Sequence, residues 1–207
     1  STWSSLAPLK TTGSNTPLFC IHAGGGHIFF YNALVKYLDK EQPIYSLQPM
    51  GFDSKLDMHK SVEQMSIDYL KEIKKVEPNG PPRQLYQALA KKKKKLLNKI
   101  KVKKADLNID TATDKLEVVK LNLIDIYSKY KWPKFRGKLT FIRSSEFVNN
   151  PVKDAHIDHW NKIAMDGVEV YQVEGHHLTI FDEPEVQNLA AQLNYCNHKF
   201  DEKSYSL

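Results

Sequence analysis

The chain has 207 residues, of which 41% are hydrophobic and 26% are charged, a composition typical of one globular domain with a full core. No apolar run approaches the ~20 residues that a membrane-spanning helix needs, so we expect no membrane span. The first residues lack the basic and apolar regions of a signal peptide, and we expect a cytoplasmic protein. Cys20 and Cys196 lie far apart in apolar surroundings, which favours buried free thiols over a disulfide.

The net charge of +6 comes from one segment of the chain. Residues 91 to 104 contain nine lysines and no acidic residue, so the remaining residues are net acidic. Nucleic-acid-binding surfaces usually interleave arginine or aromatic side chains with their lysines, and this segment has neither. We therefore expect no nucleic-acid partner. The lysines are interpreted as a solvated helix face, with a patch for a membrane surface or an acidic partner as the alternative.

Strands and helices alternate along most of the chain. Residues 1 to 16, rich in Ser, Thr and Gly, indicate an N-terminal arm or linker, followed by a domain over residues 17 to 207. A helical stripe begins at Val62 with Ser61 as its N-cap, and residues 84 to 131 also have helical periodicity. Apolar runs predict four strands, at residues 17 to 21, 43 to 48, 138 to 143 and 168 to 173. This alternation predicts an α/β fold with a mostly parallel sheet flanked by helices.

The first of these strands leads into three consecutive glycines. The segment LFCIHAGGGHIFFY, residues 18 to 31, is interpreted as a strand, a turn and a helix that begins at once. Glycines such as Gly24 and Gly25 accept positive φ and leave backbone N–H groups accessible, and a helix N-terminus favours negative charge. The turn is predicted to hold a phosphate or the oxyanion of a transition state. A turn that needs glycine only for space is the alternative.

A histidine pair, His176 and His177, follows the last predicted strand. The C-terminal ends of strands in an open α/β sheet carry ligand and catalytic groups, and a histidine there can act as a general base near neutral pH. A surface loop without a chemical role is the alternative.

Four polar residues follow the third strand: Asp154, His156, Asp158 and His159. Since no cysteine joins them, we expect no metal site. They are interpreted as a solvated polar loop before a helix, and a catalytic acid among them is the less favoured alternative.

Taken together and in order, these motifs resemble the α/β-hydrolase thioesterase domains of nonribosomal peptide and polyketide synthases. The segment PLFCIHAGGGHIFFYNALVKYL resembles their first strand, oxyanion turn and first helix, and SVEQMSIDYLKEIKKVEPNGP the helix before their nucleophile strand. The segments GKLTFIRSSE and VEVYQVEGHHLTIF resemble the C-terminal strands and the histidine loop. The resemblance covers residues 6 to 81 and 132 to 195, and it makes residues 84 to 131 a helical lid.

The resemblance implies release of an acyl, peptidyl or polyketide chain by thioester hydrolysis or cyclisation through a Ser-His-Asp mechanism. His177 matches the family histidine, which lies two residues after a glycine, here Gly175. Backbone N–H groups near Gly24 and Gly25 match half of the oxyanion hole. The implied partner is an acyl or peptidyl carrier protein whose phosphopantetheine presents the substrate, and no cofactor of the chain's own is implied.

The nucleophile of this family is absent. No G-x-S-x-G occurs in the 207 residues, and PNGP is followed by Pro82, Arg83 and a helix in place of the nucleophile strand. Loss of the buried central strands would leave apolar helix faces uncovered, so we expect a missing segment near residues 81 to 83 in an intact serine thioesterase. The triad acid is lost there or replaced by Asp154 or Asp158. The alternative is an inactive module that binds carrier proteins.

Overall fold

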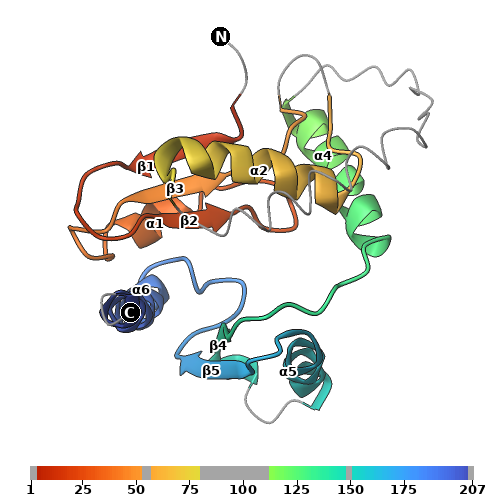
Figure 1. Ribbon diagram of the computed structural model, residues 1–207. Helices are drawn as coiled ribbons and strands as arrows, with labels where there is room; N and C mark the ends of the chain where they lie inside the picture. The colour runs from red at the N-terminus through yellow and green to blue at the C-terminus, as the bar shows by residue number, and fades with distance from the viewer. Residues whose placement is uncertain (1–3, 53–56, 80–111, 148–150, 205–207) are drawn as a thin grey trace. The chain divides into compact units, whose positions relative to one another are not determined.

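The computed structural model describes residues 4–52, 57–79, 112–147 and 151–204, and it divides the chain into two compact units (Figure 1). The first unit comprises residues 1–11, 17–28 and 43–130, and the second comprises residues 12–16, 29–42 and 131–207. The span expected as one domain, residues 17 to 207, contributes to both units. Each unit is described by itself.

The first unit contains a three-stranded sheet in the order β1-β3-β2. Strand β3 (Ile44–Leu47) pairs parallel to β2 (Leu18–Ile21) and antiparallel to β1 (Leu6–Lys10). Both β2 and β3 confirm predicted strands to within one residue. Strand β1 lies inside the expected N-terminal arm, so that arm includes a strand of the sheet. Pro8 interrupts its pattern without preventing pairing, because an edge strand tolerates a missing N–H.

Among its described residues, the first unit also contains helices α2 (Val62–Val76) and α4 (Ala112–Ser128). Helix α2 begins at the predicted N-cap, since the Ser61 side chain accepts a hydrogen bond from the backbone N–H of Gln64. Figure 1 shows this helix running alongside the strands. Helix α4 lies within the expected lid, yet its apolar face is part of the core. The buried cluster consists of Leu47, Val62, Met65, Tyr69, Val119, Leu123 and Ile126.

Residues 84 to 111 of the expected lid, which include the lysine-rich segment, and the expected break near residues 81 to 83 lie outside the described residues.

The second unit is built on a parallel pair of strands, β4 (Leu139–Ser144) and β5 (Val168–Val173). Between them in sequence come a short 3-10 turn, η1 (Ser145–Phe147), and helix α5 (Pro151–Ile163), which supplies the crossover that parallel strands require. Helix α6 (Glu185–Ser204) packs against β5 and against the short helix α1 (Tyr31–Val35). Both strands confirm predicted positions to within one residue.

The two parallel pairs, with helices between their strands, confirm the predicted α/β class and its mostly parallel pairing. Among the helices that the structure describes, none is both long and apolar enough to cross a membrane.

The core position of α4 predicts a large difference between two leucines of this helix. Leu123 is fully buried, whereas Leu121 is 56% exposed. We expect Leu123→Ala to lower the free energy of unfolding by about 3 kcal/mol, because it removes apolar contacts and leaves a cavity. Leu121→Ala, the matched control, should change it by less than about 0.5 kcal/mol. Denaturant unfolding measures both, and equal effects would show that α4 does not pack as described.

Candidate functional site

The glycine turn of the first unit follows β2 directly. The N–H of Gly26 donates to the carbonyl oxygen of Ala23 at 2.8 Å and closes the turn. Gly26 has a φ of +82°, and a Cβ there would lie 3.1 Å from side-chain atoms of Pro49 and Val119. This position therefore requires glycine, for its backbone conformation and for space.

Gly24 and Gly25 differ from Gly26, because neither has a positive φ. Gly24 is exposed, and a Cβ added to it would meet no atom within 4 Å. The space over its backbone is therefore open, as an anion-binding turn needs. The prediction that a helix begins directly after the glycines was wrong. Helix α1 begins only at Tyr31 and has five residues. Any attraction for an anion thus comes from the N–H groups of the turn and not from a helix dipole.

His22 fixes the orientation of the peptide between Ala23 and Gly24. The side chain is buried, and its Nδ1 donates to the carbonyl oxygen of Ala23 at 2.7 Å. In a trans peptide the N–H points opposite to the C=O. With the Ala23 carbonyl held by His22 and by Gly26, the N–H of Gly24 is directed away from the buried histidine.

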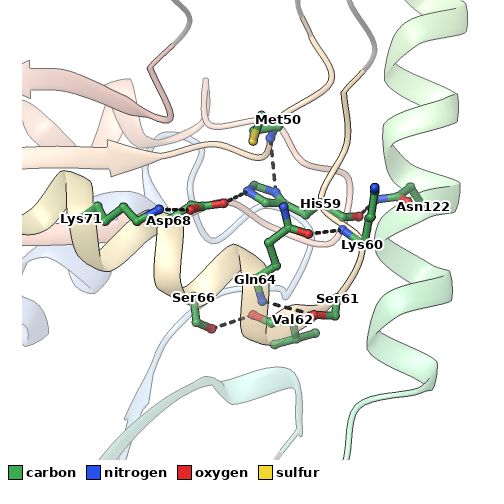
Figure 2. Close-up of polar contacts among 10 residues, drawn as sticks. All are labelled: Met50, His59, Lys60, Ser61, Val62, Gln64, Ser66, Asp68, Lys71 and Asn122. Carbon is green, nitrogen blue, oxygen red and sulfur yellow. Dashed lines mark hydrogen bonds and ion pairs between the residues drawn. The ribbon is translucent and has the colours of Figure 1, made fainter. Parts of the chain in front are cut away.

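A second buried histidine, His59, joins three parts of the first unit (Figure 2). Its Nδ1 accepts a hydrogen bond from the N–H of Met50 at 3.4 Å, after β3. Its carbonyl oxygen accepts one from the Asn122 side chain of α4 at 3.0 Å. Its Nε2 lies 3.8 Å from a carboxylate oxygen of Asp68, which also pairs with Lys71 at 2.7 Å. His59 thus connects the loop after β3, the start of α2 and helix α4.

Burial keeps both histidines neutral. It lowers the pKa of His22, and it lowers the pKa of His59 to about 4, although the Asp68 carboxylate acts in the opposite direction. The sequence did not indicate either histidine as a site residue, because no spacing rule connects His59 to His22.

The depressed pKa of His59 predicts a loss of stability in acid. A group whose pKa is 6.5 unfolded and about 4 folded binds protons preferentially in the unfolded chain. Its contribution is therefore complete above pH 6.5 and is lost as the pH falls through 6.5 towards 4. At ~1.4 kcal/mol per pKa unit, this loss amounts to about 3 kcal/mol.

Unfolding free energies measured from pH 7 to pH 4 check this expectation. Other groups titrate in the same range, so the difference between the wild type and His59→Gln isolates the histidine. The variant should have a shallower pH dependence, and identical slopes would contradict the buried, neutral state of His59.

The histidine loop of the second unit follows β5. Gly175 has a φ of +133°, and its N–H donates to the Ser145 hydroxyl at 3.3 Å. Glu146, in η1 after β4, contacts both histidines. One carboxylate oxygen lies 3.0 Å from Nε2 of His176, and the other accepts the backbone N–H of His177 at 2.6 Å.

The two histidines of this loop have different roles in these contacts. Nδ1 of His176 accepts the N–H of Leu178 at 3.2 Å, so both of its ring nitrogens have partners, one in the loop and one in η1. His177 is exposed and is held through its backbone. Sequence reasoning missed Glu146. The sequence did contain a signal for it, since Glu146 comes just after β4 as the histidines come after β5, and the carboxyl ends of neighbouring parallel strands meet at one edge of a sheet.

The remaining candidate residues lie elsewhere. Asp154 and Asp158 fall within helix α5, so the expected polar loop is a helix, and Asp158 is exposed. In the part of the chain that is described, no group of three or more His, Cys, Asp or Glu is arranged to hold a metal ion. Cys20 and Cys196 are free, and burial raises the pKa of the Cys20 thiol to about 12. His177 belongs to the second unit, and Gly24 and Gly25 belong to the first.

The contacts of Glu146 predict an ordered backbone at His177. Replacing Glu146 by Ala removes the carboxylate that accepts the His177 N–H, a charged hydrogen bond typically worth ~1.5–3 kcal/mol. We expect exchange of the His177 amide hydrogen to accelerate about tenfold or more, as followed by NMR. Glu174→Ala, which removes an exposed carboxylate next to the loop, should leave the rate unchanged. An unchanged exchange rate in Glu146→Ala would contradict the hydrogen bond between the Glu146 carboxylate and the His177 N–H.

Comparison with known proteins begins with sequence. No protein-family model matches the chain. A stretch of 79 residues is 46% identical to malpibaldin synthetase of Mortierella alpina and covers 38% of this chain and 1% of that protein. Another match, of 76 residues, is 40% identical to a dimodular nonribosomal peptide synthase of Bacillus subtilis (strain 168) and covers 37% of this chain and 3% of that protein. The chain therefore spans a small part of these relatives.

Solved structures match nearly all of the chain. The NocB thioesterase domain, in covalent complex with a fluorophosphonate nocardicin G analog, matches 93% of this chain and 99% of that chain, with a TM-score of 0.68 and 16% identity. The wild-type Vlm2 thioesterase domain matches 92% and 96%, with a TM-score of 0.62 and 15% identity. At such low identity the likeness is one of fold. It confirms the α/β-hydrolase-like fold expected from the resemblance to thioesterase domains.

Proposed function

We propose that this chain, which has the fold of nonribosomal peptide synthetase thioesterase domains, takes part in releasing an acyl or peptidyl chain from the phosphopantetheine of a carrier protein. The observation that carries the proposal is the agreement in fold with thioesterase domains over 92% or more of the chain. The shorter matches to nonribosomal peptide synthetases support the same process. The substrate arm belongs to the carrier, so the chain needs no cofactor of its own.

His177 is the proposed general base. A serine of the intact protein attacks the thioester carbonyl, and His177 takes the hydroxyl proton. The carbon–sulfur bond then breaks, and the thiol of the arm leaves with that proton. Water, or a nucleophile of the acyl chain itself, next attacks the ester and gives hydrolysis or cyclisation. His177 is preferred to His176 for this role because it matches the histidine of the thioesterase pattern, two residues after Gly175.

Gly24 is the proposed donor to the oxyanion. Its N–H is directed away from His22, and the space above its backbone is open. A donor held in place before the reaction stabilises charge that develops on the carbonyl oxygen. Gly25 follows Gly24 in the chain. Helix α4 supports the turn, because Val119 packs against Gly26.

A second candidate function is carrier-protein binding without turnover. One observation favours it: the 207 residues contain no G-x-S-x-G. For the triad acid, Asp154 and Asp158 remain the candidates, and both lie within α5.

Two forms of the protein separate the candidates. The chain with this sequence should bind an acyl-loaded carrier protein and should not react with a fluorophosphonate probe. A form with a nucleophile strand and elbow inserted between residues 81 and 83 should react with the probe and hydrolyse acyl-pantetheine thioesters. In that form His177→Ala should lower kcat about 10³-fold or more, whereas His159→Ala, on the exposed part of α5, should not.

Carrier binding by both forms with turnover by neither would favour the binding module. A chain that neither binds the carrier nor turns over thioesters with the elbow restored would contradict both functions.

A further inference from the structure

Three buried polar atoms belong to neighbouring rings inside the first unit. They are Nε2 of His22, Nε2 of His59 and the hydroxyl oxygen of Tyr69, on residues that are only 6%, 1% and 4% exposed. Among the described residues none of the three atoms has a hydrogen-bond partner. The Tyr69 ring lies edge-on to both imidazoles, with ring centroids 6.0 Å from His22 and 5.7 Å from His59. These residues are called the His22–His59–Tyr69 cluster below.

The other contacts of the two imidazoles determine which atoms carry hydrogen. His22 donates from Nδ1 to the Ala23 carbonyl, so in the neutral ring its Nε2 is an acceptor. His59 accepts at Nδ1 from the N–H of Met50, so its Nε2 carries the hydrogen and is a donor. The Tyr69 hydroxyl can do both. The cluster therefore presents one acceptor, one donor and one hydroxyl.

Such a set fits one water molecule. A buried polar group without a partner costs ~1–3 kcal/mol, and internal water typically makes about three hydrogen bonds to groups of this kind. One water can accept from Nε2 of His59, donate to Nε2 of His22 and bond to the Tyr69 hydroxyl. A cation fits less well, because Nε2 of His59 presents a hydrogen.

We propose that His22, His59 and Tyr69 bind one internal water molecule, and that this hydrated cluster positions the peptide between Ala23 and Gly24. The water holds one side of the His22 ring while Nδ1 on the other side holds the Ala23 carbonyl. The N–H of Gly24 is thereby kept directed outwards. The contacts of His59 with Met50 and Asn122 extend the same network to the loop after β3 and to α4 (Figure 2). The three residues are positioning residues.

The inference rests on the proposed function only in giving the Gly24 N–H a role as oxyanion donor. The water site and the orientation of the turn stand without it.

NMR of the chain with this sequence tests the water site. At pH 7, ¹⁵N spectra should show the Nδ1–H tautomer for His22 and the Nε2–H tautomer for His59. A long-lived water should give a cross-peak with the Nε2 hydrogen of His59. Either opposite tautomer, or no such cross-peak, would overturn the proposal, and this measurement needs no variant.

Tyr69→Phe tests the positioning. It removes the hydroxyl and keeps the ring, and it should abolish the water cross-peak and accelerate amide exchange at Gly26, which donates to the Ala23 carbonyl, about tenfold. Tyr45→Phe, the control, removes a hydroxyl from strand β3 of the same unit. It should change neither the water cross-peak nor the exchange rate of the Gly26 amide. Loss of the cross-peak with an unchanged Gly26 rate would overturn the positioning role. No readout uses a thioester, so a protein that fails to bind carriers can still confirm the inference.

Discussion

Gly26 has no Cβ, and this allows Val119 and Leu123 of α4 to pack directly against the glycine turn. A side chain at Gly26 would collide with Val119 and with Pro49 of the loop after β3. The turn, that loop and α4 therefore share one apolar contact. The same two α4 residues belong to the core cluster that includes Leu47 and Met65. The open backbone at Gly24 is consequently supported by a well-packed layer, even though Gly24 itself is exposed.

Polar contacts add to this apolar support, and in both units histidines make them. In the first unit His22 holds a carbonyl of the turn, and His59 holds Met50 and α4. In the second unit the Glu146 carboxylate holds the ring of His176 and the backbone of His177. The proposed chemistry thus separates two roles of histidine. His22, His59 and His176 orient backbone groups, whereas His177 is the residue proposed to move a proton.

Much of the fold could be predicted from the sequence, because parallel strands are short apolar runs and α2 carries a clear cap at Ser61. Strand β1 was missed because a short edge strand containing Pro8 lies among Ser, Thr and Gly. The helix after the glycines was expected too early, since the apolar and aromatic residues after Gly26 do not show where a helix begins. The His22–His59–Tyr69 cluster could not be predicted, because its members come from three elements with no fixed spacing between them.

The proposed function requires this fold to recognise a thioester that is bound to a carrier protein. The most direct test is a binding titration of the chain with a carrier protein in two forms, one with an acyl-loaded phosphopantetheine arm and one without the arm. Under the proposed function, the chain binds the carrier more tightly when the loaded arm is present. Equal binding of both forms, or binding of neither, would contradict it.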